Sequence, residues 1–214
     1  MKSLAAIAIA AAVVGAAGGA ARADAHELTA RFGPEAGVTR LADAASSDAA
    51  QVWTGGLAAG LSYGVTNRLA LDAELAAGTC GEARYADVTV DIGGTTQPAG
   101  TLARTSRYGR ALVGASLRLG VSVIPTLGVA VGVGTRMRGA GAFSNADVMG
   151  IEPDDDAGGA GLELLASARA GLDVRFDAHW LAGATVAATR AWPSNGAAAD
   201  ALTAQLHIAY AWYP

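Results

Sequence analysis

Residues 51–65, QVWTGGLAAGLSYGV, alternate between two kinds of side chain. Large residues such as Trp53, Leu57 and Leu61 occupy odd positions, while small residues fill most of the even positions. A period of two places successive side chains on opposite faces of a β-strand. This stretch therefore predicts a strand with one bulky apolar face and one face of small side chains.

The same alternation recurs along the chain and predicts eight strands. Their approximate ranges are 26–38, 51–65, 68–79, 104–120, 123–138, 161–176, 179–192 and 201–213. Short turns are predicted at 66–67, 121–122 and 177–178, and long connections at 39–50, 80–103, 139–160 and 193–200. Outer-membrane barrels alternate long and short connections in this way, because their periplasmic turns are tight while their outer loops are free to grow.

The residues on the face with small side chains distinguish a membrane barrel from a soluble β-sandwich. Gly56, Gly60 and Gly132 lie on some strands, while long charged residues such as Glu74 and Arg110 lie on others. The narrow interior of an eight-stranded barrel accommodates long side chains only where the facing residues are small. A solvent-facing sheet has no such need and is weakened by interior glycine. We therefore predict an all-β fold, an eight-stranded antiparallel up-and-down transmembrane β-barrel.

The opposite face of the predicted strands is apolar over most of its length, as at Leu71, Val131 and Leu172. Aromatic residues lie on this face near the strand ends. They are Tyr63, Phe176, Trp180, Tyr210 and Trp212 toward the short turns, and Trp53 and Trp192 toward the long loops. Two aromatic girdles are typical of a barrel that crosses a bilayer. We therefore expect this face to contact lipid.

The N-terminal residues 1–25 have the layout of a cleaved secretory signal. A single lysine, Lys2, precedes an apolar run, and Ala23-Asp24-Ala25 supplies the small residues of a cleavage site. A cut after Ala23 is the alternative. The Ala/Gly-rich run is only marginally apolar for a transmembrane helix. We expect residues 1–25 to be removed and residues 26–214 to form one outer-membrane barrel domain.

The charge of the expected mature chain argues against a nucleic-acid partner. Removing Lys2, Arg22 and Asp24 leaves 13 basic residues of the 15 and 18 acidic residues of the 19, a net charge of −5. Cys80 is the single cysteine, so no internal disulfide is available, and no Cys/His spacing indicates a metal site. We expect no cofactor and no metal.

The last predicted strand carries a motif. Gln205, His207, Tyr210 and Trp212 occupy positions of the polar, glycine and two aromatic residues in the C-terminal insertion signal of outer-membrane proteins, with His207 in place of glycine. Over nearly the whole mature chain, the sequence resembles the small eight-stranded barrels of the OmpA transmembrane-domain and OmpX kind. The resemblance implies an outer-membrane location and insertion by the barrel assembly machinery.

Many charged residues are predicted to point into the barrel. An isolated buried ion costs several kcal/mol, so we expect these residues to form a salt-bridge network that plugs the lumen. Its members are Glu27, Arg31, Glu35, Asp72, Glu74, Arg110, Arg118, Arg136, Arg138, Glu163, Arg169, Asp173 and His207. Arg68, Tyr108, Arg175 and Gln205 are predicted to face the same way.

Strand adjacency suggests particular pairs within this network. Asp72 and Glu74 are expected to pair with Arg110 and Arg118, and Glu163 with Arg136 or Arg138. His207 is expected beside Glu27, Arg31 and Glu35, where the first and last strands meet. The alternative is a narrow charged pore gated by the same pairs. The small number of strands favours the filled interior.

Arg40, Arg107 and Arg190 interrupt the outward apolar face at the long-loop ends of their strands. We hypothesise that they bind phosphates of lipopolysaccharide. Snorkelling to water without a specific partner is the alternative. Asp154-Asp155-Asp156 make the third long loop acidic, but their spacing lacks the ligand order of an EF-hand, which favours a solvated loop tip over a calcium site.

The sequence gives little support for catalysis. Lipid-modifying barrel enzymes need a nucleophile beside a histidine and an orienting carboxylate, and no inward serine lies next to His207 on its own strand. The pattern favours a non-enzymatic surface protein that contacts outer-membrane lipid and lipopolysaccharide, with an unidentified loop partner. The alternative is OmpW-like passage of small or amphipathic molecules, and a lipid A modifying enzyme is least favoured.

Overall fold

A computed structural model describes residues 25–42, 49–145, 161–194 and 198–213 of the chain. Its eight strands are β1 (Leu28–Ala42), β2 (Ala49–Gly64), β3 (Leu69–Ile92), β4 (Thr95–Arg118), β5 (Val123–Phe143), β6 (Gly161–Arg175), β7 (Trp180–Pro193) and β8 (Ala199–Trp212). No helix among these residues is long and apolar enough to cross a membrane. The predicted signal segment, residues 1–25, lies outside the described residues except for Ala25.

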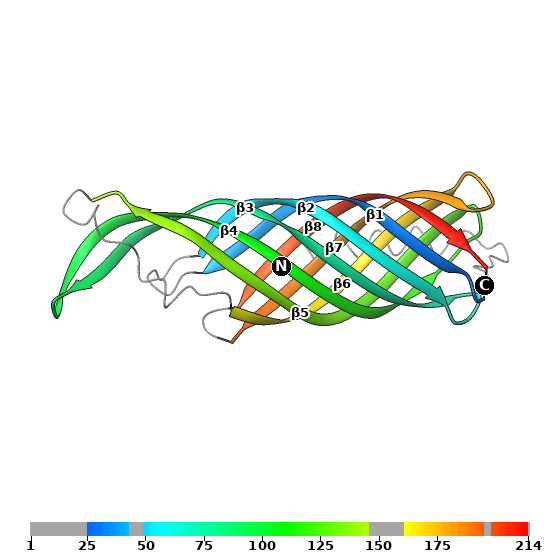
Figure 1. The fold of residues 1–214 in the computed structure, drawn as a ribbon, viewed down its shortest axis with the longest axis horizontal. Helices are drawn as coiled ribbons and strands as arrows, with labels where there is room; N and C mark the ends of the chain where they lie inside the picture. The colour runs from blue at the N-terminus through cyan, green and yellow to red at the C-terminus, as the bar shows by residue number, and fades with distance from the viewer. Residues whose placement is uncertain (1–24, 43–48, 146–160, 195–197, 214) are drawn as a thin grey trace.

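The strands form one closed antiparallel barrel in chain order (Figure 1). Closure is made by β1 and β8, with Leu28 opposite Trp212 and Arg40 opposite Asp200. Because Leu28 also lies opposite Tyr63 of β2, the start of β1 and the end of β8 lie at the end of the barrel that carries the short turns. The predicted eight-stranded up-and-down barrel is confirmed.

The barrel is apolar outside and polar inside. Leu71, Val131 and Leu172 are all exposed on the outer face, whereas Glu74 and Arg118 are buried in the lumen. A soluble protein places its polar residues the other way round. Backbone groups inside a bilayer have no water to bond, and a closed barrel is one of the few structures that satisfies them all.

Aromatic side chains gather outside the barrel at the short-turn end. Tyr210 lies at the centre of this group, with ring centroids 5.1 Å from Trp180, 5.5 Å from His179 and 6.0 Å from Trp212. Trp53 lies exposed toward the other end. This arrangement matches the predicted girdle positions on the outward face.

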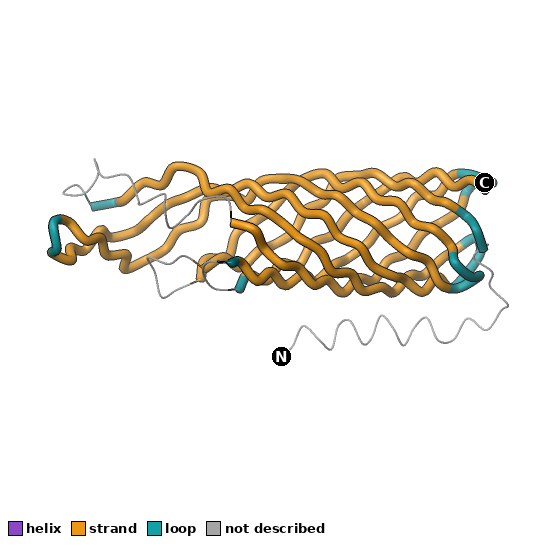
Figure 2. Tube along the Cα trace, turned by 60° about the horizontal axis from the view of Figure 1, so that its bottom comes forward, coloured by secondary structure: helices purple, strands orange, loops and turns teal. Residues whose placement is uncertain are grey.

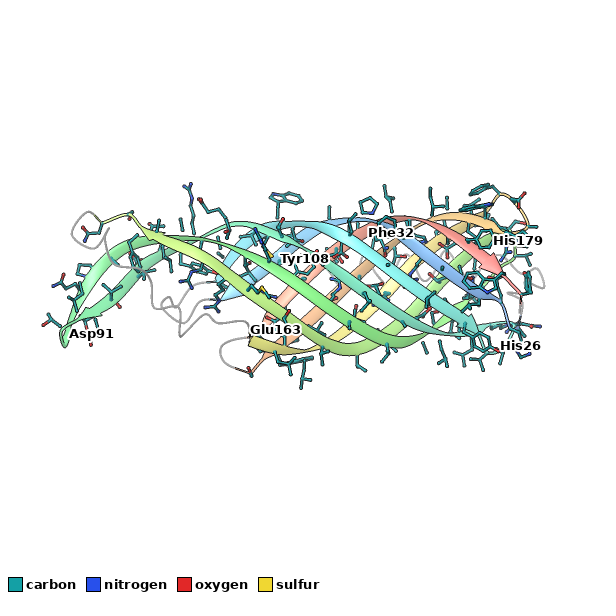
Figure 3. The ribbon with its side chains drawn as sticks, viewed as in Figure 1. His26, Phe32, Asp91, Tyr108, Glu163 and His179 are labelled. Carbon is teal, nitrogen blue, oxygen red and sulfur yellow. The ribbon has the colours of Figure 1, made fainter. Side chains whose placement is uncertain are left out.

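The long loop predicted at residues 80–103 is wrong, because most of these residues form strands. Residues 80–92 and 95–103 continue β3 and β4 as a long hairpin that projects past the closed barrel (Figures 1 and 2). Strand β5 also runs further than predicted, to Phe143, and pairs with β4 as far as Leu102. The hairpin tip, beside Asp91, is the part of the described chain furthest from the short turns (Figure 3).

Two features of the hairpin account for the missed strands. Register shifts between Cys80 and Ala83, and between Tyr85 and Thr89, break the strict alternation on which the prediction relied. The tip is a two-glycine turn in which Gly93 and Gly94 have φ of 61° and 83°, a conformation that other residues rarely adopt. Asp91 accepts a hydrogen bond from the Gly94 backbone N–H at 2.8 Å and so closes the turn.

Inward glycines provide space for long side chains from other strands. A Cβ at Gly60 would lie 2.7 Å from Nε of Arg31. Cβ atoms at Gly56 and Gly78 would lie 2.7 and 2.6 Å from the hydroxyl oxygen of Tyr108. Long side chains therefore lie directly over inward glycines, as the sequence predicted.

Two adjacent glycines of β2 offer a matched test of this packing. A Cβ at Gly56 would also lie 2.9 Å from Cα of Gly78, whereas a Cβ at Gly55, on the outer face, meets nothing within 4 Å. We expect Gly56→Ala to destabilise the barrel by about 1–3 kcal/mol through overpacking, and Gly55→Ala to have no such effect. The measurement is the temperature at which detergent-solubilised protein loses its folded gel mobility. Equal temperatures for the two variants would contradict the proposed packing.

Candidate functional site

The centre of the lumen is organised around one carboxylate. Glu74 of β3 lies 3.0 Å from Arg169 of β6, 3.2 Å from Arg31 of β1 and 3.4 Å from Arg110 of β4. The Glu74 side chain is 6% exposed and each of the three arginine side chains is at most 16% exposed. Ion pairs this deeply buried hold their partners firmly, because separating them leaves an uncompensated charge.

A second carboxylate extends this cluster toward the long-loop end. Glu35 of β1 accepts hydrogen bonds from Arg110 at 2.6 Å and from the Tyr108 hydroxyl at 2.6 Å. Further out, Arg136 lies 3.3 Å from Glu163. Tyr108 and Glu163 point into the barrel in Figure 3. Residues of five strands, β1, β3, β4, β5 and β6, thus meet across the lumen.

A third cluster closes the short-turn end. Glu27, which precedes β1, pairs with Arg175 and, at 3.1 Å, with Arg118, and it accepts hydrogen bonds from Thr29 and from the Tyr213 hydroxyl. Burial raises the pKa of Glu27, but the hydrogen bond from Arg175 and the charges of both arginines outweigh it. The pKa of this carboxyl therefore lies below its ordinary value.

The lumen also contains a histidine–carboxylate pair. Nε2 of His207 lies 2.7 Å from Oδ1 of Asp173, and the His207 side chain is almost fully buried. A Cβ at Gly183 would overlap the Asp173 carboxylate, so the glycine makes room for the pair. Gln205 is buried on the same face of β8.

Several pairs differ from those that strand adjacency suggested. Arg118 reaches Glu27 instead of Asp72 or Glu74. His207 lies against β1 as expected, opposite Gly33, but its side chain pairs with Asp173 of β6. Asp72 faces the lumen but makes no ion pair with any described residue. Long side chains cross the narrow interior, so their partners are set by depth in the barrel as well as by strand order.

The remaining predicted residues fall into three groups. Arg138 lies half-buried on the inward face near Glu163. Arg68 lies exposed in the short turn, one residue before β3 begins. Arg104 and Tyr213 contribute to the interior but were not among the predicted residues. Arg104 shares the even-numbered face of β4 with Arg110, a signal that the unrecognised hairpin concealed.

The space left inside the lumen is small. Cavities with volumes of about 40, 40 and 20 Å³ lie among these side chains. A site of this size holds individual water molecules. The ion pairs therefore fill the lumen in this structure.

The arrangement does not form a catalytic triad. Ser62 and Ser116 line the same small cavity as His207 and Asp173, but neither serine makes a hydrogen bond to His207. The pair also faces the lumen, whereas a lipid substrate would approach from outside. Within residues 25–42, 49–145, 161–194 and 198–213, no group of three His, Cys, Asp or Glu residues is placed to hold a metal ion. The acidic segment Asp154–Asp156 lies outside the described residues.

The three outward arginines have different surroundings. Arg190 lies 3.7 Å from Asp200 and its guanidinium is 5.9 Å from the Trp192 ring centroid. Arg40 lies opposite Asp200 in the β1–β8 register. Arg107, three strands from β1, has no ion pair or hydrogen bond to a described side chain. The three residues therefore do not form one site.

No protein-family model and no curated protein matches the chain. Solved structures do resemble it. Ail, the attachment invasion locus protein of Yersinia pestis, aligns with a TM-score of 0.52 and 12% identity over 88% of this chain and 100% of Ail. OprG of Pseudomonas aeruginosa gives 0.47 and 14% over 89% and 97%, and AlkL gives 0.46 and 16% over 89% and 92%. The chain has the fold of the small eight-stranded outer-membrane β-barrels.

The role of the central carboxylate can be tested against an exposed ion pair. We expect Glu74→Gln to destabilise the barrel by about 3–5 kcal/mol, because three buried guanidiniums lose their shared partner. Glu82→Gln removes the exposed pair with Arg84 in the hairpin and is expected to cost about 0–1 kcal/mol. Urea unfolding in lipid vesicles, followed by tryptophan fluorescence, measures both. A Glu74→Gln barrel as stable as Glu82→Gln would refute the central role.

Proposed function

We propose that this chain is an integral outer-membrane protein of Gram-negative bacteria with a structural or surface-interaction role and a plugged lumen. The lumen ion pairs around Glu74 carry the proposal, because they occupy the path that a transported molecule would take. Outer-membrane lipid and lipopolysaccharide would contact the apolar face. The barrel assembly machinery would insert the chain by recognising Gln205, His207, Tyr210 and Trp212 of β8.

The projecting hairpin supports a surface role. Pairing between β2 and β3 ends at Thr54 and Cys80, but β3 continues to Ile92. Beyond Cys80, β3 pairs with β4 on one edge and no longer with β2 on the other. Segments that project from a rigid scaffold are where binding residues concentrate. Charged Glu82 and Arg84 keep the hairpin soluble and would bias it toward particular partners.

A conductance measurement tests the plug. We expect purified protein in a planar bilayer to give no stable ionic current, because the lumen cavities hold only single waters. An eight-stranded barrel is narrow enough for side chains to fill. Reproducible channel steps would instead support the alternative of a narrow pore for small or amphipathic molecules. Turnover of lipid A that disappears in His207→Ala would support the lipid-modifying enzyme.

A truncation tests the hairpin. Joining Arg84 to Ala103 through an Asn-Gly turn removes residues 85–102 and keeps the Arg84–Ala103 pair at the base of the hairpin. We expect the truncated protein to keep its folded gel mobility, while cells that express it attach to a cultured cell layer several-fold less than cells with the intact hairpin. Glu82→Gln in the full-length hairpin serves as the control for surface charge alone. Unchanged attachment after truncation would refute a surface role for this element.

A further inference from the structure

The lipid-facing surface over β2–β5 is hollowed. A groove of about 500 Å³ lies just below the outer limit of the closed barrel. Its apolar lining includes Leu57, Ala59, Leu75, Ala77, Gly109 and Ala111. The floor is low where Ala77 lies opposite Gly109, and Leu75, which lies opposite Ala111, projects at its side.

Arg107 lies at the outer end of this groove. It precedes Gly109 by two residues on the same face of β4, opposite Thr79 of β3 and Met137 of β5. The closed barrel ends at this level, since β2–β3 pairing stops at Cys80 and β5–β6 pairing starts at Arg136. Arg107 is exposed, has no ion pair to a described residue, and lies two residues beyond Gly109, the outermost residue of β4 that lines the groove.

A second hollow of about 710 Å³ follows on the same face toward the short turns. Its lining includes Leu61, Leu71, Ala73, Val113, Ala115 and Val131. Both hollows are lined in part by β4, and the stretch of β4 from Arg107 to Ala115 is eight residues, or about 27 Å, long. One leaflet of hydrocarbon is about 15 Å deep, so even a tilted strand offers the channel enough length for an acyl chain.

The lack of a nearby carboxylate distinguishes Arg107 from the other two outward arginines, Arg40 and Arg190. Arg190 is partly neutralised by Asp200 at 3.7 Å, and Arg40 lies opposite the same carboxylate. No carboxylate pairs with Arg107 among the described residues, while Thr79 lies opposite it in register and Thr135 lines the groove. A guanidinium with neighbouring hydroxyls favours a phosphate.

We propose that Arg107 and the channel over β2–β5 bind one phosphorylated acyl lipid of the outer leaflet, lipid A of lipopolysaccharide. The phosphate would pair with Arg107, and one acyl chain would occupy the hollow over Gly109 and Ala111. This inference rests on the proposed outer-membrane location. The sequence analysis proposed phosphate binding for Arg40, Arg107 and Arg190, whereas the structure-based proposal assigns it to Arg107 alone.

The experiment titrates detergent-purified protein with bisphosphorylated lipid A and counts bound lipid by native mass spectrometry. We expect Arg107→Gln to weaken binding about tenfold, the loss of one charge-assisted contact. Gly109→Leu fills the groove, and a Cβ there meets only Oγ1 of Thr135 at 3.7 Å, so the barrel tolerates it. It is expected to weaken binding similarly. Arg190→Gln and Ala184→Leu, the latter on the lipid-facing surface of β7, are the matched controls and should change affinity by less than about twofold.

Two further ligands identify the source of the phosphate. Dephosphorylated lipid A should bind wild-type protein about tenfold more weakly than lipid A does. The Arg107→Gln substitution should not weaken its binding further. Phosphatidylglycerol binding as tightly, with the same dependence on Arg107, would overturn the assignment to lipid A in favour of any phospholipid. Equal losses in Arg107→Gln and Arg190→Gln, or no loss in either, would overturn the site. Folded gel mobility of every variant separates this outcome from failure of the proposed barrel itself.

Discussion

Charge neutralisation in a narrow lumen is the constraint on which this structure depends. Glu74 receives three guanidiniums from three other strands, and Glu35 receives one of the same guanidiniums, that of Arg110. Each ion is buried, so none is stable without its partners. The pairs Glu35–Arg110 and Glu74–Arg169 therefore cross-link strands that do not pair through their backbones.

This network in turn requires a particular distribution of side-chain size. Arg31 fits only because Gly60 has no Cβ, and Tyr108 reaches Glu35 over Gly56 and Gly78. A shift of register by one residue would point every long side chain into lipid and every apolar one into the lumen. Interior packing and strand register therefore fix each other.

The sequence alone predicts the parts of the structure that depend on which residues alternate between the two faces of a strand. Strand number, closure and the inward set around Glu74 follow from a period of two and from glycine placed against charge. The partners of Arg118 and His207 did not follow, because contacts across a lumen depend on relative depth, which is set by the stagger of all eight strands. The hairpin beyond Cys80 was missed for another reason: its bulges interrupt the period itself.

Arginine chemistry links the inside of the barrel to its rim. Within the lumen, the chain supplies the carboxylates, and Glu27 alone joins Arg118 of β4 to Arg175 of β6. On the outer face of the closed barrel, the described residues place Asp200 beside Arg40 and Arg190. Arg107 obtains no carboxylate from the described chain, and its neighbours on β3 and β5 leave an apolar channel beneath it. On the proposal above, a phosphate of the surrounding membrane neutralises the Arg107 guanidinium. Carboxylates of the protein neutralise the arginines inside the lumen in the same way.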